Sequence, residues 1–524
     1  MAQSKPFARI VLPVLTIGLF ALVSSGVRLY VHFAFAQTPR PITSCDNSVW
    51  DVSYRTYSIS NDLVASGGLD CLTPTVSNVT IEGNGKTITT DGGNAVRIVN
   101  QAGIVIRSVV SSSDISIEEE AADRNLVDRF SGGGDVVVLD GDNNVITNST
   151  IGSFRAVGRG SNAAAGEMVT NSTIEGTADV LVEITGSEQS PCPLGEHTIS
   201  NNTIINHRSG TPTDALATFM LCCTSNSTVL GNVIRSTDSA VGLSIRDDAS
   251  STTFENNTFW TNAGVALLIA AGEPDKGYPS GNTFKQNTFR SENAPSNSIQ
   301  AIGANNQFLY NTFWGNDVFA GGTITGGFGN TFDHNTFYVE GSGNRSQRMV
   351  YENGPPADTF TNNIFDYSGP SVFSFDAFSF NRMTSNYNLF HNRTGSVTFG
   401  SYGSIANWRS ESVRAGHPED ANSLVANPMF VDPSTGNFSL TIDSPARSAG
   451  TNGSDIGAYS SKPTESCTER WTCGGWSTCI SGIQQRTCVD SSSCGTIYSR
   501  PILNKACTQT DTAPPAFIKN LKVQ

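Results

Sequence analysis

A run of three charged residues is the strongest candidate for chemistry in this chain of 524 residues. Arg246, Asp247 and Asp248 follow one another directly after a stretch in which apolar and polar residues alternate. Two carboxylates beside a guanidinium can bind sugar hydroxyls, coordinate calcium, or supply the carboxylate pair of a hydrolase. We therefore treat these residues as candidate catalytic residues. The alternative is that they are ordinary polar residues on an exposed strand.

Strand alternation indicates which other charged residues face the same way as Arg246. In the run VGLSIRDD the apolar residues alternate with others, so Arg246 is expected on the outer face of its strand. The same pattern places Glu183 and Glu352 on the outside, and Asp140 ends its strand. We predict that these four residues bind the substrate.

A short acidic segment offers a candidate metal site. The sequence DGDNN contains Asp140, Asp142 and Asn144, which carry the oxygen ligands that calcium prefers. An ordinary turn is the alternative, and no other cofactor or metal is predicted. The histidines lie at different turns without a shared spacing, which argues against a metal centre.

A repeat from about residue 146 to residue 390 must position these side chains. Its unit is an apolar residue, four further residues and a second apolar residue, as in FKQNTF, FLYNTF and FDHNTF, which start at 284, 308 and 332. In most copies asparagine stands two residues before the second apolar position, and Ser149 and Ser172 replace it in the first two. The asparagines are Asn202, Asn232, Asn257, Asn287, Asn311, Asn335, Asn363 and Asn388.

A constant period of this size predicts one supersecondary unit per repeat, stacked into a solenoid. Phe, Ile, Val, Thr and Asn dominate without helical periodicity, which favours short strands with asparagine at the turns. We predict an all-β, right-handed parallel β-helix with an asparagine ladder; an antiparallel sandwich predicts no constant spacing. The expected core columns are Phe284, Phe308, Phe332 and Phe289, Phe313, Phe337.

The β-helix is predicted to span residues 78–460 in roughly 12–13 coils, after an N-terminal cap at 37–77. Residues 111–134 break the pattern with the acidic run ISIEEEAADRN. We interpret that run as a loop, either a solvated insertion or a cover over a groove.

The N-terminal residues 1–36 are predicted to direct export. Lys5 and Arg9 precede an apolar run, and Ala34-Phe35-Ala36 is typical of a signal-peptidase site. A retained membrane anchor is the alternative, because the apolar run is nearly long enough to span a bilayer. Either interpretation places the rest of the chain in a secreted or cell-surface location.

The charge balance limits the possible partners. The chain has 32 basic and 46 acidic residues, a net charge of −14, which argues against nucleic acid. It also disfavours a polyanionic glycan unless a local basic patch or a cation reverses the field. We expect a monomer that binds a polysaccharide or cell-surface glycan and contacts a membrane only through an uncleaved N-terminal segment.

Eleven cysteines are consistent with an oxidising compartment. Cys45 and Cys71 are predicted to form a disulfide in the N-terminal cap, and Cys192 is predicted to pair with Cys222 or Cys223. The other six lie within 467–507, and their pairing stays open because six cysteines allow fifteen connectivities. These six are Cys467, Cys473, Cys479, Cys488, Cys494 and Cys507.

Two segments of the solenoid resemble known families. NVTIEGNGKTI at 78–88 is similar to the opening coils of right-handed β-helix proteins of the pectate-lyase-like superfamily. Residues 405–459, with Trp408, the step NPMF and the motif DIGA, resemble the last coils of exported β-helix repeat proteins. This resemblance implies fold and domain boundary and says little about chemistry.

After a linker at 461–466, residues 467–507 are similar to thrombospondin type 1 repeats, sharing Trp471, the motif WSxC and Arg486. The family implies a thin disulfide-bonded ribbon in which tryptophan stacks on arginine, although CISG replaces its CxxTCG step. This module is either adhesive or simply structural. Residues 508–524 resemble a linker and the first strand of a fibronectin type III domain, from a truncated product or as a disordered tail.

The enzyme patterns of the superfamily are incomplete. Between residues 78 and 460 there are few lysines to serve as a lyase base, and only the DD element of the polygalacturonase pattern is present. We therefore expect a secreted or surface binding and structural protein, adhesive through a β-helix stalk. A polysaccharide lyase or glycoside hydrolase that uses Arg246, Asp247 and Asp248 is the alternative.

Overall fold

The structure is a computed structural model, and the chain divides into two compact units, Met1–Thr38 and Pro39–Gln524. The predicted targeting segment 1–36, the linker 461–466 and the tail 508–524 lie outside the described residues. Within the described part, no helix is long and apolar enough to cross a membrane. The described residues are 38–119, 121–158, 164–186, 195–208, 217–237, 241–269, 278–292, 299–301, 303–315, 329–339, 358–368, 383–459, 470–476, 483–491, 501 and 504–506.

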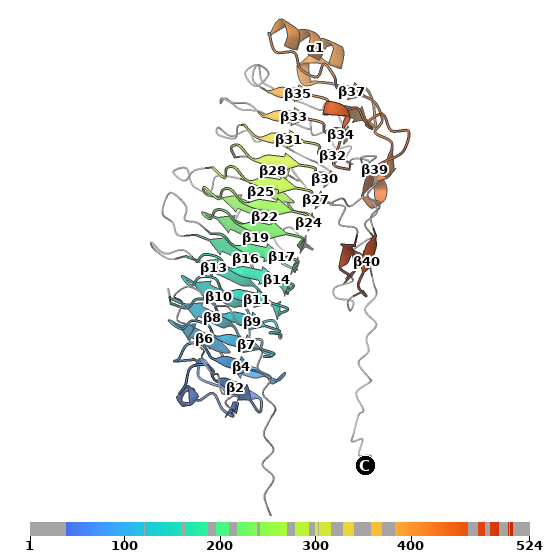
Figure 1. Cartoon of the computed structure of the whole chain (residues 1–524). Coiled ribbons are helices and arrows are strands. Elements are labelled where there is room, and N and C mark those ends of the chain that lie inside the picture. Colours follow the sequence, from blue (N-terminus) through green and yellow to red (C-terminus); the bar gives the residue numbers. More distant parts are fainter. Residues whose placement is uncertain are drawn as a thin grey trace, which may run out of the picture. The chain divides into compact units, whose positions relative to one another are not determined.

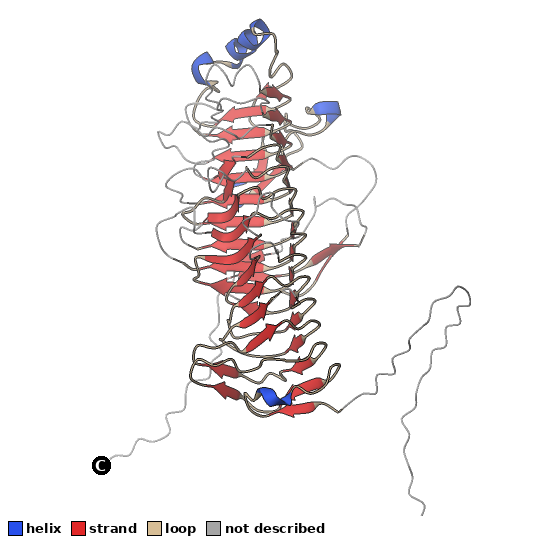
Figure 2. Ribbon diagram, turned by 90° about the vertical axis from the view of Figure 1, so that its left-hand side faces the viewer, coloured by secondary structure: helices blue, strands red, loops and turns tan. Residues whose placement is uncertain are grey.

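Three parallel sheets form a β-helix in the second unit, and their strands lie one above another through successive coils (Figure 1). Figure 2 shows how strongly strands predominate over helices. We call the sheets of 15, 11 and 9 strands sheet 1, sheet 2 and sheet 3. From β14 to β16 the chain passes through sheets 1, 2 and 3 in that order.

Sheet 1 consists of β1 (Arg40–Ile42), β2 (Thr56–Ile59), β4 (Thr80–Glu82), β7 (Val105–Arg107), β9 (Leu126–Asp128), β11 (Val145–Thr147), β14 (Met168–Thr170), β17 (Thr198–Ser200), β20 (Thr228–Leu230), β23 (Thr253–Glu255), β26 (Thr283–Lys285), β29 (Gln307–Leu309), β31 (Thr331–Asp333), β33 (Thr359–Thr361) and β35 (Thr384–Asn386). Sheet 2 consists of β12 (Thr150–Ile151), β15 (Thr173–Gly176), β18 (Thr203–Asn206), β21 (Val233–Ser236), β24 (Thr258–Thr261), β27 (Thr288–Ser291), β30 (Thr312–Gly315), β32 (Thr336–Val339), β34 (Ile364–Tyr367), β36 (Leu389–Asn392) and β37 (Leu424–Val425). Sheet 3 consists of β6 (Val96–Val99), β8 (Ile115–Glu118), β10 (Val136–Leu139), β13 (Phe154–Val157), β16 (Val180–Thr185), β19 (Ala217–Cys222), β22 (Val241–Arg246), β25 (Leu267–Ile269) and β28 (Ile299–Ala301). A separate pair is formed by β3 (Leu63–Ala65) and β5 (Ile88–Thr90).

The core is built from columns of identical side chains, as the repeat predicts. Phe284, Phe308 and Phe332 stack with ring centroids 4.7 and 4.5 Å apart. Phe289 and Phe313 stack in the second column at 5.3 Å. Because register repeats from coil to coil, each aromatic ring is buried between two copies of itself, which stabilises that register.

The predicted asparagine ladder lies at the turn between sheets 1 and 2. Asn311 is typical: its Oδ1 accepts hydrogen bonds from the backbone N–H of Asn287 at 2.9 Å and from Asn287 Nδ2 at 3.0 Å. Its own Nδ2 donates to the carbonyl oxygen of Phe284 at 2.8 Å. The same pattern joins the ladder from Asn202 to Asn388, so every buried carboxamide has both donor and acceptor partners.

Residues 111–134 form a regular coil, so their interpretation as an acidic loop is wrong. Ile115, Ile117 and Val127 are fully buried in β8 and β9. Val105, Leu126 and Val145 occupy the same position in three successive coils. The sequence intervals between them are shorter than any interval between repeats after residue 146, so this coil has no residues left over for an insertion. Sheet 1 therefore has more strands than the 12–13 coils expected, and it starts at β1, within the segment assigned to the cap.

A disulfide joins Cys45 to Cys71 at the N-terminal end of the β-helix. Of the two adjacent cysteines at 222–223, Cys223 is disulfide-bonded and Cys222 keeps its thiol. Cys192 lies outside the described residues.

The C-terminal end of the β-helix is closed by α1 (Ile405–Arg414), whose N-terminus is capped by Ser404. Trp408 on α1 is fully buried, stacks on Phe399 at 5.6 Å, and donates from Nε1 to Asp420 Oδ2 at 2.8 Å. The asparagine ladder ends here, because the N–H of Asn388 donates to Ser423 Oγ at 2.8 Å.

Residues 426–459, which we call the return segment, follow β37 and pack against the outer face of sheet 2. Ala446 and Ile456 bury Ile364 and Leu389 there, and Phe438 lies against Trp314. The segment contains the antiparallel strands β38 (Phe430–Asp432) and β39 (Asn437–Leu440). Short 3₁₀ turns in the chain are η1 (Asn47–Val49), η2 (Gly400–Tyr402), η3 (Pro433–Thr435) and η4 (Thr451–Gly453).

The cysteine-rich module is described in part. A disulfide joins Cys473 to Cys488 across the antiparallel strands β40 (Trp471–Cys473) and β42 (Cys488–Asp490). The strands β41 (Ile483–Gln485) and β43 (Asn504–Ala506) form a second antiparallel pair. The Arg486 guanidinium lies 4.3 Å from the Trp476 ring centroid, a cation–π contact. The remaining predicted disulfide cysteines, Cys467, Cys479, Cys494 and Cys507, lie outside the described residues.

Candidate functional site

The outer face of sheet 3 carries two of the predicted site residues, Glu183 and Arg246. One outward row aligns Arg155 with Glu183 and then with Met220 and Ser244. A second row aligns Leu139, Val157, Thr185, Cys222 and Arg246. Because neighbouring strands lie about 4.8 Å apart, these rows fix the separation of the predicted residues.

Asp140 does not share a site with the Arg246 cluster. It follows Leu139 on β10, and four strand steps separate Leu139 from Arg246 on β22. This separation is roughly 19 Å, well beyond the reach of two side chains around one sugar ring. Glu352, the fourth predicted binding residue, lies outside the described residues.

Glu183 is engaged by a basic neighbour on the adjacent strand. Its Oε2 accepts from Arg155 Nε at 2.6 Å, across the pair β13–β16. Near the other end of the sheet, Arg97 makes two hydrogen bonds to Glu118, at 2.9 and 2.8 Å. The outer face of sheet 3 therefore presents charges that are largely neutralised in pairs.

Arg246 differs from these paired arginines. Its Nε donates to Ser244 Oγ at 3.1 Å, whereas its Nη2 is buried without a hydrogen-bond partner. Asp247 and Asp248 follow with φ of 41° and 46°, in the left-handed region that Asp and Asn adopt more readily than most residues other than glycine. Asp247 Oδ2 accepts from Cys222 Sγ of the preceding coil at 3.0 Å, so its carboxylate already has a donor within the protein.

The calcium prediction does not fit the position of Asn144. This side chain is fully buried, and its Oδ1 accepts from the N–H and Nδ2 of Asn125, both at 3.0 Å. Asp142 Oδ1 accepts from the N–H of Ala165 at 2.8 Å. Asn144 is thus unavailable to a cation beside Asp140. Over the described ranges, no group of three His, Cys, Asp or Glu side chains is placed to hold a metal ion.

A second ladder, which we call the mixed ladder, occupies the turn between sheets 3 and 1. Glu167 and His197 are neighbours in it, and the N–H of Glu167 donates to His197 Nδ1 at 3.3 Å. Sequence reasoning missed it because its residue types vary, although a constant offset, two residues before the first apolar position of each repeat, could have revealed it. Its members, all buried, are Asn125, Asn144, Glu167, His197, Ser227, Thr252, Asn282, Asn306, Asn330 and Asp358.

The ionisable members of the mixed ladder have shifted pKa values because burial disfavours their charged forms. Burial raises the pKa of Glu167 well above its usual value and raises that of Asp358 to about 7. It lowers the pKa of His197 to about 4, so this imidazole is neutral at physiological pH. Glu167 Oε2 is buried and has no hydrogen-bond partner. These groups lie inside the fold and are unavailable to a polymeric substrate.

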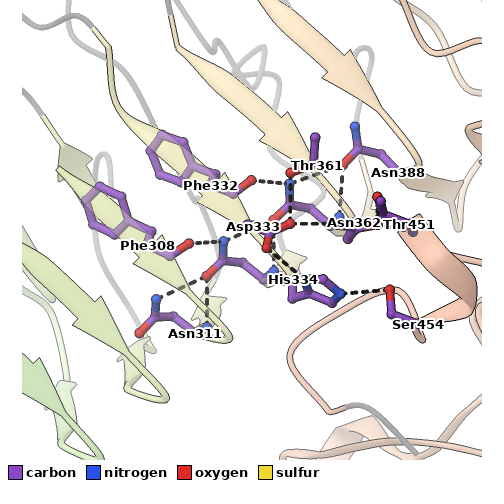
Figure 3. Close-up of polar contacts among 12 residues, drawn as sticks. Phe308, Asn311, Phe332, Asp333, His334, Thr361, Asn362, Asn388, Thr451 and Ser454 are labelled. Atoms are coloured by element: carbon purple, nitrogen blue, oxygen red, sulfur yellow. Dashed lines mark hydrogen bonds and ion pairs between the residues drawn. The ribbon is translucent and has the colours of Figure 1, made fainter. Parts of the chain in front are cut away.

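Sequence reasoning also missed a contact between a β-helix turn and the return segment. His334 Nδ1 lies 2.9 Å from Asp333 Oδ2, and His334 Nε2 lies 3.0 Å from Ser454 Oγ (Figure 3). His334 and Ser454 are 120 residues apart in the sequence, and no local motif connects them.

The stacked parallel coils, their interior ladders and the closing helix define a right-handed parallel β-helix repeat protein. Residues 161–337 match the family described as the right-handed beta helix region. Among solved structures, the chain is similar to a PL6 family polysaccharide lyase from Pseudopedobacter saltans, with 11% identity over 76% of this chain and 95% of that chain. The TM-score of that similarity is 0.28. No curated protein matches the chain.

Proposed function

We propose that this chain is an exported binding and structural protein whose β-helix stalk attaches to a polysaccharide or cell-surface glycan. The outer face of sheet 3, around Arg246, is the proposed contact surface. The disulfides Cys45–Cys71 and Cys473–Cys488 support an oxidising, extracellular location. The net charge of −14 favours neutral or weakly acidic glycans over highly charged ones.

The guanidinium of Arg246 carries this proposal. The Arg246 side chain is half-buried and forms no ion pair with a carboxylate of the described residues, whereas Arg155 does, so its N–H groups can donate to acceptor oxygens of a sugar. The planar guanidinium can bind such oxygens because it holds several N–H donors in one fixed plane. Arg155 lies on the same face but is already paired with Glu183.

The arrangement of carboxylates supports binding more than cleavage. A glycosidase places two carboxyl groups about 5–9.5 Å apart around one bond. Asp140 lies four strand steps from the Arg246 position, Glu183 is paired with Arg155, and Asp247 accepts from Cys222. Each of these carboxylates thus has a position or a partner that does not suit a shared catalytic role.

The test is a binding measurement with the full-length chain against neutral and acidic polysaccharides, with and without calcium. We expect binding that Arg246→Ala weakens about tenfold or more, because a hydrogen bond to a charged donor is lost. Arg155→Ala is the matched control and should leave affinity within about twofold. Equal affinity in Arg246→Ala and the parent chain would contradict the proposed surface. New reducing ends or unsaturated uronate would instead support the lyase or hydrolase alternative.

A further inference from the structure

The return segment brings a serine hydroxyl to an imidazole that is held by a carboxylate. Asp333 Oδ2, His334 and Ser454 Oγ form a continuous chain with heavy-atom distances of 2.9 and 3.0 Å (Figure 3). Both distances are within the range that links a nucleophile to its base and the base to the group that orients it.

Asp333 fixes the protonation pattern of this chain. Its Oδ1 accepts from Thr361 Oγ1 and Asn362 Nδ2, both at 2.8 Å, while Oδ2 faces His334 Nδ1. Burial alone would raise the pKa of Asp333, but hydrogen bonds from His334, Asn362 and Thr361 together lower it. The ionised carboxylate assigns the proton of the neutral imidazole to Nδ1. Nε2 then accepts from the Ser454 hydroxyl.

The imidazole has little freedom to turn away from Ser454. His334 is 7% exposed, and its ring stacks on Tyr310 with centroids 4.8 Å apart. The backbone N–H of His334 also donates to the carbonyl oxygen of Thr361 at 3.1 Å, which fixes the turn.

The return segment is anchored on both sides of Ser454. Before it, the N–H and Oγ1 of Thr451 donate to Asn362 Oδ1 at 2.8 and 3.0 Å. After it, the N–H of Gly457 donates to the carbonyl oxygen of Asn362 at 2.8 Å. A Cβ atom at Gly450 would lie 2.5 Å from Ser454 Oγ, so the hydroxyl occupies a narrow, half-buried position.

We propose that Ser454 and His334, positioned by Asp333, form an acyl-transfer centre that hydrolyses small acyl esters. Ser454 Oγ forms a bond to the ester carbonyl carbon while its proton passes to His334 Nε2. The ester C–O bond then breaks, the alcohol leaves with that proton, and the acyl group remains on Ser454. Water attacks next with His334 as base, so that the carboxylic acid is released and the serine hydroxyl is restored.

The narrow surroundings of Ser454 define the substrate class. Because Gly450 lies against one side of Ser454 Oγ, where a Cβ atom would come within 2.5 Å of that oxygen, we expect acyl groups no larger than acetyl. This centre goes beyond the proposed glycan binding, because none of its residues belongs to the sheet 3 face. A failure of one proposal therefore leaves the other standing.

The test combines covalent labelling with turnover in the full-length chain. A fluorophosphonate probe should label Ser454, located by mass spectrometry, and the chain should hydrolyse 4-nitrophenyl acetate. Ser454→Ala should abolish labelling at this position and turnover. His334→Asn keeps a residue that tolerates the positive φ of 55° and should slow both reactions about 100-fold or more.

Ser434 provides a matched control, because its Oγ lies 2.7 Å from Asp432 Oδ1 on the same segment, without an imidazole link. Ser434→Ala should leave turnover unchanged. Asp333→Asn should alter the pH profile of the labelling rate, which a purely structural contact would not do. The proposal is wrong if Ser454 reacts no faster than Ser434 while circular dichroism and thermal melting show a folded chain.

Discussion

The asparagine ladder and the mixed ladder flank the same strands of sheet 1 yet use different chemistry. In the asparagine ladder each carboxamide repeats the contacts of Asn311, with one oxygen accepting and one amide donating. In the mixed ladder the same geometry holds at Asn306, whose N–H donates to Asn330 Oδ1 at 2.9 Å. Its middle and last positions contain Glu167, His197 and Asp358 instead.

The difference shows what a buried ladder demands of its side chains. A carboxamide both donates and accepts, so a stack of them satisfies itself. A carboxyl group has no N–H to donate, Glu167 Oε2 has no hydrogen-bond partner, and burial of such a group in its ionised form is costly. The asparagine ladder should therefore be insensitive to pH, and the mixed ladder should respond to it.

The largest effect is expected from breaking the asparagine ladder. Asn311→Leu removes the acceptor of two Asn287 donors and the donor to the Phe284 carbonyl. Leaving these buried groups unsatisfied should cost about 4 kcal/mol of unfolding free energy, measured by urea denaturation. Gln307→Leu on the same coil is exposed and should change stability by less than about 0.5 kcal/mol. A loss no larger in Asn311→Leu than in this control would show that the ladder is dispensable.

Asp358→Asn should stabilise the chain at high pH. The folded pKa of about 7 exceeds the usual 3.8, so the folded state binds the extra proton, and wild-type stability falls as pH rises from about 4 to about 7. The amide carries no charge at either pH and keeps an acceptor oxygen for Asn330. We expect the unfolding free energy of Asp358→Asn to exceed that of the parent by about 3 kcal/mol at pH 8 and by almost nothing at pH 4, measured by thermal melting. An equal gain at both pH values would rule out the ionisation as its cause.

His197→Asn tests a pH effect of the opposite sign at another position of the mixed ladder. The folded pKa of about 4 is below the usual 6.5, so the unfolded chain binds the proton and wild-type stability falls as pH drops from 6.5 to 4. As the pH drops from 6.5 to 4, the unfolding free energy of the variant should fall by about 2 kcal/mol less than that of the parent, measured by denaturation at each pH. Parallel pH curves for parent and variant would show that His197 does not titrate in this way.

The smallest effect is expected from extending the asparagine ladder by one coil. Ser172 Oγ accepts from the N–H of Ser149 at 3.1 Å, in the place of a carboxamide. Ser172→Asn would add an amide that can donate to the preceding coil, and the unfolding free energy should rise by about 1 kcal/mol. A loss of stability in thermal melting would show that the first coils cannot accommodate the larger side chain.

The sequence alone was sufficient to predict the parallel β-helix, the phenylalanine columns and the asparagine ladder, because each of them depends on one kind of residue recurring at a constant spacing. The coil at 111–134 was missed because Phe130 occupies the ladder position and donates its N–H to Ser149 Oγ, so the repeat phrase is absent. Acidic residues there suggested a loop, but Glu118 lies on an outward position and pairs with Arg97.

The candidate sites were harder to predict than the fold. Alternation placed Glu183 and Arg246 on the outer face, but only the register reveals that Glu183 pairs with Arg155 and that Asp140 is distant. The Ser454–His334 contact depends on the path of the return segment, which is a tertiary feature that local spacing does not encode.

The closing helix has a consequence for assembly. The last coil would otherwise present unpaired strand edges above a column of aromatic rings, in the parallel, in-register arrangement found at the growing end of an amyloid fibril. Trp408 covers Phe399 at that end, and Ser423 takes the hydrogen bond that another asparagine would accept. α1 and its neighbours thus cover the end of the β-helix at which a second copy of the chain could otherwise add by strand pairing.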